Sequence, residues 1–202
     1  METVQTPSLN EPDFNYSGIY TYADYLRWTI EERIELIRGK IFRMSPAPLR
    51  SHQEILTNLL NAFVPYFQKN PCQLFTSPFD VRFPRKGKKD EDIITVLQPD
   101  LCVICDPQKV DDRGGIGAPE LVVEVLSKGN TRKEMKLKYE IYEESGVKEY
   151  WVIAPEHRVC FIYVLEGDRY RALPPVPEDQ LLQSVRFPGL EVAVNDVFKS
   201  KF

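Results

Sequence analysis

Two almost uninterrupted apolar runs near the middle of the chain constrain its fold more than any other feature. One is Leu-Cys-Val-Ile-Cys at 101–105, and the other is Leu-Val-Val-Glu-Val-Leu at 121–126. Such runs have the length of strands, and strands without polar alternation are covered on both faces of their sheet. The sequence therefore predicts an α/β fold, with helices packed on a mixed β-sheet.

The segments around these two strands alternate between helix and strand signals. Capping boxes of the Ser/Thr-x-x-Glu type at 51–54 and 131–134 predict two helix starts, and Gly146 predicts the end of the second helix.

A loose tail at 1–18 and a single domain at 19–202 are expected. The expected elements are a short helix ending at Thr29, a hairpin at 34–44, a helix from 51, strand segments at 74–75 and 79–83, the two apolar strands with a loop at 106–117 between them, a helix at 132–145, a strand at 149–154, a hairpin at 158–173, and a last strand pair with a short helical end.

Composition places the chain among globular proteins without membrane spans. No apolar stretch in the 202 residues approaches the ~18 residues of a spanning helix, and the N-terminus lacks the pattern of a signal peptide. A cytoplasmic protein with no membrane partner is expected.

The charge balance bears on nucleic-acid binding. The net charge of −4 means that affinity for nucleic acid would have to come from local basic patches, although such runs are more often solvated loops and helix faces. The basic residues that are candidates for contacts with nucleic acid are Arg82, Arg85, Lys86, Lys88 and Lys89 in the first patch, and Lys128, Arg132 and Lys133 in the second.

The four cysteines are predicted to be reduced, mostly buried thiols. Cys102 and Cys105 have the spacing of a metal or redox pair, but residues three apart on a strand point to opposite faces. No second pair exists to complete a zinc site. The other two cysteines are Cys72 and Cys160.

Glu124 is the residue from which a chemical hypothesis starts. It lies in the middle of an apolar strand, where a carboxylate is costly unless a cation meets it or it is protonated. Asp100 begins the preceding apolar strand, so the two carboxylates converge if those strands are neighbours. A divalent cation would relieve their repulsion, and a structural arginine or lysine that pairs with Glu124 is the alternative.

The helix predicted at 132–145 supplies a candidate cation. On a helical wheel Lys138 lies about 60° from Met135, within the apolar arc, whereas Lys136 lies about 100° away on the polar side. Lys138 is therefore expected to face the sheet that carries Glu124. The simpler alternative is a surface pair of Lys138 with Glu134 four residues earlier.

Taken together, these residues resemble a bacterial family of restriction endonucleases that is abundant in cyanobacteria and belongs to the PD-(D/E)XK nuclease superfamily. The similarity covers about residues 20 to 190. It is carried by Pro99-Asp100, Pro119 to Ser127, Lys138, Tyr142, Gly146-Val147 and Glu149 to Val152, and upstream by Glu35 to Lys40, Ser45-Pro46 and His52.

The resemblance implies a restriction-endonuclease-like core and a set of site residues. Asp100 and Glu124 would hold Mg²⁺, or Mn²⁺ in its place, with help from the backbone carbonyl of Val125. The superfamily pattern places a lysine two residues after the glutamate, and this sequence has Leu126 there. The resemblance implies that Lys138 replaces it, to orient or deprotonate the attacking water or to stabilise the phosphate. His52 and Glu54 are second candidates; we expect them to cap their helix, and we do not expect His52 to act as a general base.

Three functions stay open on the sequence. The first is a metal-dependent DNA endonuclease that hydrolyses phosphodiester bonds. Its partner would be DNA, and assembly into a homodimer stays open. The second is a nucleic-acid-binding or assembly module that has kept the fold and lost turnover, which Leu126 and the acidic net charge favour. The third is hydrolysis of another phosphoester by the same residues.

Overall fold

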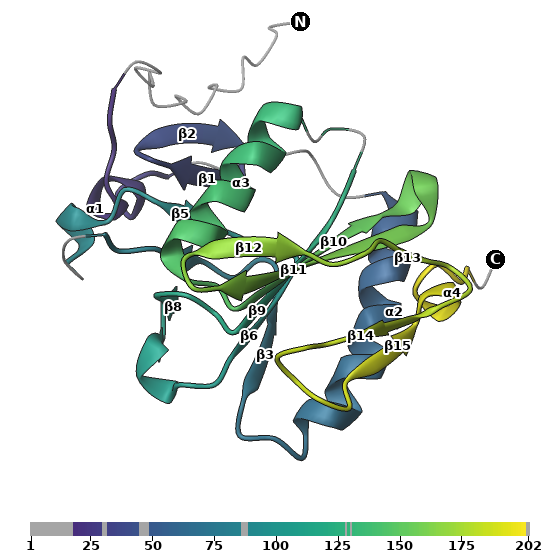
Figure 1. Cartoon of the computed structure of the whole chain (residues 1–202). Helices are drawn as coiled ribbons and strands as arrows, with labels where there is room; N and C mark the ends of the chain where they lie inside the picture. The colour runs from purple at the N-terminus through teal and green to yellow at the C-terminus, as the bar shows by residue number, and fades with distance from the viewer. Residues whose placement is uncertain are drawn as a thin grey trace, which may run out of the picture.

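The central sheet runs through the middle of the molecule in the computed structural model, which describes residues 18–29, 32–44, 49–85, 89–127, 129 and 131–200 (Figure 1). Its strand order is β12-β11-β10-β9-β6-β3, and β13 pairs with β11. β9 and β10 are parallel, and the other neighbours are antiparallel. The strands are β3 (Gln73–Thr76), β6 (Leu101–Ile104), β9 (Leu121–Val125), β10 (Glu149–Ala154), β11 (Val159–Glu166), β12 (Arg169–Ala172) and β13 (Val176–Pro177).

A second sheet of short strands lies on one side of the central sheet. Its order is β2-β1-β5-β4-β8-β7, and a separate strand pair, β14 with β15, follows late in the chain. These strands are β1 (Ile34–Ile37), β2 (Lys40–Arg43), β4 (Val81–Arg82), β5 (Val96–Leu97), β7 (Val110–Asp111), β8 (Gly114–Ile116), β14 (Leu181–Gln183) and β15 (Glu191–Ala193).

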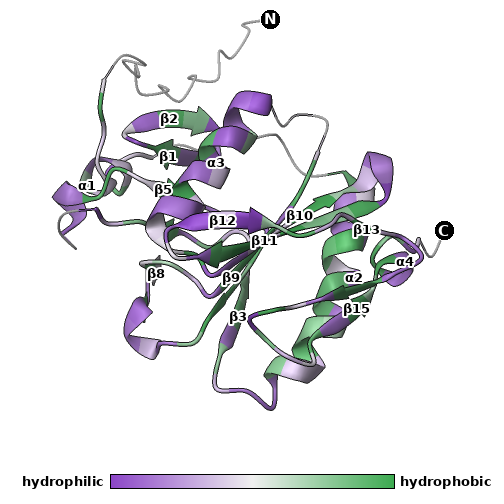
Figure 2. Ribbon diagram, in the orientation of Figure 1, coloured by the Kyte–Doolittle hydropathy of each residue, from purple (hydrophilic) through white to green (hydrophobic). Residues whose placement is uncertain are grey.

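Two long helices cover opposite faces of the central sheet, as the apolar runs predict. One core contains apolar residues of α2 with Val123 and Trp151, and the other contains residues of α3 with Val122 and Tyr150. Neighbouring residues of one strand thus point into different cores, and every residue of β9 and β10 is buried, whereas the edge strand β12 is hydrophilic (Figure 2). The helices are α1 (Tyr22–Tyr25), α2 (Arg50–Phe67), α3 (Arg132–Ser145) and α4 (Val194–Val197), with short 3₁₀ turns at Asp90–Asp92, Pro107–Lys109 and Pro155–His157.

Most predicted elements are confirmed, and three differ. α1 ends at Tyr25 instead of Thr29, and the predicted loop at 106–117 contains β7 and β8. Gly115 accounts for part of this second difference, because its amide donates to the Asp80 carbonyl at 2.8 Å and draws the segment alongside β4. The predicted tail lies outside the described residues, apart from residue 18.

The third difference concerns the start of α2, where the predicted capping box at 51–54 is wrong. The helix begins at Arg50, its N-cap is Leu49, and no side chain caps it. Ser51 already lies in the first turn, so its hydroxyl cannot occupy the N-cap position. Glu54 instead forms an ion pair with Arg50 and accepts a hydrogen bond from Ser200.

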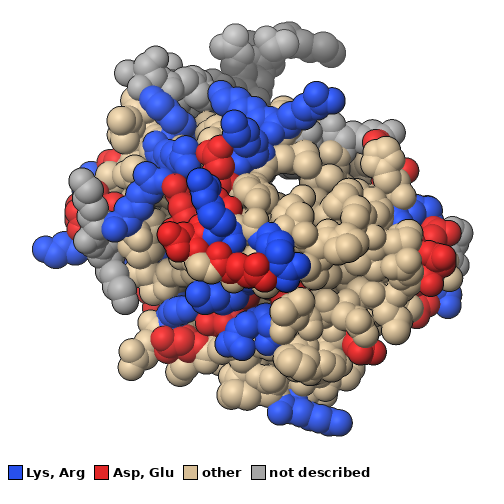
Figure 3. All heavy atoms as spheres, in the orientation of Figure 1, with Lys and Arg blue, Asp and Glu red and all other residues tan. Residues whose placement is uncertain are grey.

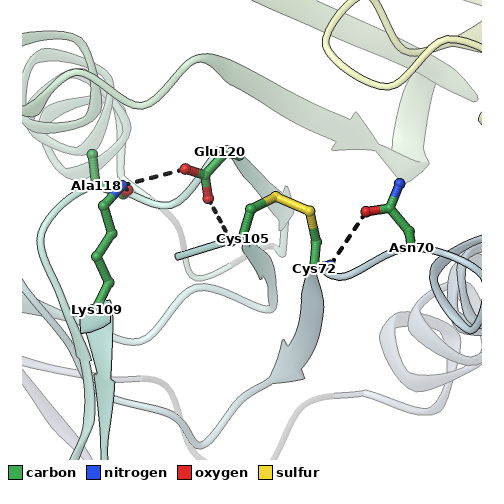
Figure 4. The surroundings of a disulfide bond; sticks show 6 residues. All are labelled: Asn70, Cys72, Cys105, Lys109, Ala118 and Glu120. Carbon is green, nitrogen blue, oxygen red and sulfur yellow. Dashed lines mark hydrogen bonds and ion pairs between the residues drawn. A yellow bond between two sulfur atoms is a disulfide. The ribbon is translucent and has the colours of Figure 1, made fainter. Parts of the chain in front are cut away.

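The prediction that all four cysteines are reduced is also wrong, because Cys72 and Cys105 form a disulfide (Figure 4). Gln73 pairs with Ile104 in the β3–β6 ladder, so continuing the register by one residue places the two cysteines opposite each other. Their Cα atoms are 3.9 Å apart. The prediction is confirmed for Cys102 and Cys160, which are free and buried.

Hydrogen bonds hold the backbone on both sides of the disulfide. The Cys72 amide donates to the side chain of Asn70, and the Cys105 amide donates to Glu120 Oε2 at 2.8 Å (Figure 4). Lys109 in turn forms an ion pair with Glu120.

Among the helices of the described residues, none combines the length and the apolar character that crossing a membrane requires.

Candidate active site

Asp100 and Glu124 come together because β6 and β9 are neighbours. Leu101 pairs with Val123 in this antiparallel ladder, so continuing the register by one residue sets Asp100 opposite Glu124. Residues directly opposite each other have Cβ atoms about 5 Å apart. The Val125 amide donates to Asp100 Oδ2 at 2.7 Å, which fixes the aspartate against β9. The predicted convergence of the two carboxylates is confirmed.

Lys138 reaches this pair from α3, on the face that the helical wheel predicts. Its Nζ lies 3.0 Å from Glu124 Oε1, and the lysine is buried. Lys136 is largely exposed and pairs with Glu140 on the outside of the helix. The alternative of a surface pair with Glu134 is therefore wrong, since the ammonium group of Lys138 contacts buried carboxylates. Tyr142, one helical turn further on, donates its hydroxyl to Glu124 Oε1 at 2.7 Å.

Glu35 is a third carboxylate in the cluster, and the sequence analysis did not assign it a role. Its Oε1 lies 3.0 Å from Lys138 Nζ and accepts the Gln98 amide at 2.9 Å. Glu35 is buried in β1, where every residue is buried. The same signal that identified Glu124, a charge inside an apolar strand, is present in Ile34-Glu35-Leu36-Ile37 and could have found it.

His52 belongs to the cluster, while Glu54 does not. The His52 Nε2 atom donates to Asp100 Oδ2 at 3.2 Å, and Nδ1 is buried without a hydrogen-bond partner among the described residues. Burial alone would lower the pKa of His52, but the hydrogen bond to Asp100 and its charge outweigh burial and raise it. The expectation that His52 caps its helix is therefore wrong, because the helix begins two residues earlier and the ring contacts Asp100.

The electrostatics of the site reflect an excess of negative charge. Burial raises the pKa of Glu124 to about 7; the Lys138 ammonium opposes this shift, and the charges of Asp100 and Glu35 add to it. Burial would lower the pKa of Lys138, but Glu124 and Glu35 raise it well above its usual value. Glu35 and Glu124 thus contact one lysine, while Asp100 lies opposite Glu124 and contacts His52, and a further cation would improve the balance of charge.

The carboxylates fit a divalent cation that is partly hydrated. Both hydrogen bonds of Asp100 go to Oδ2 and both of Glu124 go to Oε1, so their second oxygens have no hydrogen bond with a described residue. Within the described part of the chain, no three His, Cys, Asp or Glu side chains surround a point at which a metal could sit. A cation here would have two carboxylates and complete its shell from backbone and water, as Mg²⁺ commonly does.

The predicted basic contacts require one clear correction. Arg82 is buried, and its guanidinium binds the Gly115 carbonyl and Asp111, so it cannot contact nucleic acid. Its buried position in β4 makes it a structural residue of the second sheet.

The other basic candidates are on the surface or outside the described residues. Arg85 is half-exposed and forms an ion pair with Glu144. Charged side chains of both signs gather over the left half of the face in Figure 3, where Figure 1 shows α3 and the β1–β2 hairpin. Lys89, Arg132 and Lys133 are exposed, while Lys86, Lys88 and Lys128 lie outside the described residues.

Comparisons with known proteins agree with this architecture. One solved structure, titled "Crystal structure of a putative nuclease belonging to DUF820 from Anabaena variabilis ATCC 29413", is 20% identical in sequence and has a TM-score of 0.69. The match covers 88% of this chain and 97% of that one, and it confirms the predicted mixed α/β fold. No protein with a curated function matched.

A family model decides the relationship. The model of the family Uma2, described as "Putative restriction endonuclease", matches residues 22–195, which span the two sheets and the whole carboxylate cluster. That match covers well over half of the chain, and it agrees with the resemblance found in the sequence. The chain belongs to this restriction-endonuclease family.

Proposed function

We propose that the protein is a Mg²⁺-dependent endonuclease that hydrolyses phosphodiester bonds of DNA. The observation that carries the proposal is the placement of Asp100 opposite Glu124 on neighbouring strands, with Lys138 buried between Glu124 and Glu35. Family membership supports a nuclease-like function, and the geometry adds the acidic pair and lysine that such chemistry uses.

Each residue has a defined part in this proposal. Asp100 and Glu124 would hold Mg²⁺, with the backbone carbonyl of Val125 as a further ligand. When bound, such a cation would supply Lewis acidity at the phosphate and would lower the pKa of a water molecule that it binds. Lys138 donates to Glu124 from the side of α3, so its ammonium lies where it can stabilise negative charge on the reacting phosphate.

Two further residues keep the carboxylates in position. His52 holds Asp100 from α2, and Tyr142 holds Glu124 from α3. Both are positioning residues, because each contacts a carboxylate that would bind the cation. The DNA backbone would be held by exposed basic residues, namely Arg85, Lys89, Arg132 and Lys133, with Lys86, Lys88 and Lys128 as further candidates.

Nicking of supercoiled plasmid tests the proposal directly. The wild-type protein is expected to nick plasmid in Mg²⁺ or Mn²⁺, and Asp100→Ala is expected to lose at least ~100-fold in rate, because one of two carboxylate ligands is removed. Asp106→Ala, an acid after the other end of β6, is the matched control and should keep full activity. Absence of nicking above the Asp100→Ala background would contradict the proposal.

A second candidate function, a binding module without turnover, is favoured by Leu126 in the usual lysine position. Calorimetric titration with Mn²⁺ separates the two candidates. Binding that is lost in Glu124→Gln indicates a working metal site. DNA binding that depends on salt but not on metal would favour the module.

A further inference from the structure

A pocket of about 530 Å³ opens beside the carboxylate cluster and has no part in the proposed chemistry. His52 lines it and also binds Asp100, so the pocket and the cluster share a wall. The volume lies in the ~300–1,000 Å³ range of pockets that bind small molecules. A ligand here would lie next to the phosphate that the cluster would cleave.

The lining of the pocket combines an apolar wall with polar groups. Leu126, Met135 and Pro155 supply apolar surface. Leu126 directly follows β9, the strand that carries Glu124, so this apolar surface lies beside the carboxylate cluster. Ser51, Arg132, Glu156 and His157 supply donors and acceptors around the pocket. Such a mixture suits an aromatic ring with polar edges more than a purely apolar or purely anionic ligand.

Three positive features also meet at this pocket. First-turn residues of α2 and of α3 both line it. The N-cap of α2, Leu49, offers no side-chain cap, and the His52 amide donates to the Leu49 carbonyl, so among the described residues the amides of Arg50 and Ser51 are left for an anion. Arg132 is exposed and forms no ion pair with a described residue. Together these groups match a phosphate attached to the ring.

We propose that the pocket binds one unpaired nucleotide of the DNA strand, next to the phosphate that is cleaved; this inference rests on the proposed function. The base stacks on Leu126, Met135 and Pro155, and its phosphate lies at Arg132 and the helix ends. A base in a duplex cannot enter unless it leaves the stack, which costs a few kcal/mol. The substrate class is therefore single-stranded or locally opened DNA.

Equilibrium binding of labelled oligonucleotides, measured by fluorescence anisotropy with Ca²⁺ in place of Mg²⁺, tests this inference. A short oligothymidylate is expected to bind about tenfold more tightly than a duplex of the same length, and about tenfold more tightly than the same backbone with abasic residues. Equal affinity for the three probes would overturn the inference. Tighter binding of the duplex would indicate ordinary groove or backbone contacts, and would also overturn it.

Variants locate the binding in the pocket. Met135→Glu places a negative charge in the pocket and Arg132→Ala removes its cation, and each is expected to weaken oligothymidylate binding about tenfold. Lys136→Ala removes a charge from the outside of the same helix and should leave the affinity within about twofold. Arg132 is exposed, so its variant stays informative if Met135→Glu fails to fold. Unchanged affinity in Arg132→Ala would contradict the inference.

The two proposals fail separately in this design. Mn²⁺ binding and plasmid nicking report on Asp100 and Glu124, and the pocket variants report on strand recognition. A protein that nicks plasmid but binds all three probes equally would keep the proposed function and refute the pocket. Absence of nicking by the wild type together with a strong preference for oligothymidylate would refute the proposed function and keep strand recognition by the pocket.

Discussion

At the scale of single residues, Lys138 has the most demanding environment in the molecule. Its ammonium group is buried at 3.0 Å from both Glu35 and Glu124. Removing one partner from a buried ion pair leaves uncompensated charge, which commonly costs about 3–5 kcal/mol. Here two carboxylates would be left, with Asp100 close by, so the state of this lysine governs both stability and chemistry.

Replacing Lys138 with alanine should therefore lower both activity and stability, and added Mg²⁺ should distinguish the two effects. Lys138→Ala should abolish plasmid nicking and lower the free energy of unfolding at neutral pH by about 3 kcal/mol without metal. Added Mg²⁺ should restore part of the lost stability but not the activity, because a bound dication replaces the missing charge without replacing the ammonium donor. Urea unfolding with and without Mg²⁺ measures the first effect, and nicking measures the second.

Lys136→Ala is the matched control, because Lys136 lies on the same helix but pairs with Glu140 at the surface. It should change the free energy of unfolding by less than about 0.5 kcal/mol and leave nicking intact. Equal loss of nicking from the two variants would contradict the assignment of Lys138.

The sequence predicted part of this cluster and missed the rest for identifiable reasons. Glu124 and Lys138 were predictable because each interrupts a local apolar pattern, and Asp100 because it begins the neighbouring apolar strand. Glu35 does so too, but its strand lies in a hairpin, and a hairpin strand commonly faces water on one side. Glu35 is buried by the packing of the second sheet against α3, and the spacing of apolar residues along one strand does not predict such packing.

At the scale of elements, the two predicted helix starts had different outcomes because a capping box is a local signal. The Thr131 hydroxyl accepts the Glu134 amide, and Gly146 ends α3 with a left-handed φ of 89°. The box at 51–54 is equally good by sequence, yet α2 begins at Arg50. Propensity fixes helix ends only where tertiary contacts agree, and the contact of His52 with Asp100 shows that α2 is also positioned by the site.

Glu143 attaches α3 to β12, and this attachment should depend on pH. Its Oε1 accepts the Tyr170 amide at 2.7 Å, and Oε2 binds Arg169. The hydrogen bond from the Tyr170 amide, with Arg169 in support, lowers the pKa of Glu143 in the folded protein. A lowered folded pKa stabilises the protein above the unfolded pKa of about 4.3, and this contribution is lost as the pH falls through the folded value.

Glu143→Gln should accordingly lower the free energy of unfolding by about 1 kcal/mol at pH 7, since a charge-assisted hydrogen bond becomes a neutral one. The difference between the two proteins should shrink as the pH is lowered and disappear near about pH 3. Glu140→Gln, a surface acid of the same helix, should show little difference at either pH. Urea unfolding across this range provides the measurement, and a pH-independent difference would refute the argument.

At the scale of the whole molecule, β6 carries a different constraint at each end. Asp100 precedes its first residue, and Cys105 follows its last, where the disulfide to Cys72 ties β6 to the edge strand β3. The order of elements predicted a mixed sheet, but the pairing of β3 with β6 joins residues that are distant in sequence. The disulfide depends on that pairing, which is why the sequence, read by local spacing alone, predicted four reduced cysteines.

The disulfide between Cys72 and Cys105 is expected to stabilise the folded protein. The bond closes a loop with a sequence separation of 33 residues, so its removal should lower the free energy of unfolding by about 2–4 kcal/mol, mainly through the greater freedom of the unfolded chain. The double variant Cys72→Ser/Cys105→Ser tests this under oxidising conditions, and reduction of the wild type should give a similar loss.

Removal of the disulfide should lower the stability of the protein but leave its metal affinity unchanged. Asp100 is held by the Val125 amide and His52 rather than by β3. The Mn²⁺ affinity of the double variant, measured by calorimetry below its unfolding temperature, should stay within about twofold of the wild type, a change of under ~0.5 kcal/mol. A large loss of affinity would mean that the disulfide positions the far end of β6, and that stability and the metal site are one cooperative unit. The Cys160→Ser variant, which alters a buried free thiol of β11, serves as the control for substitution alone.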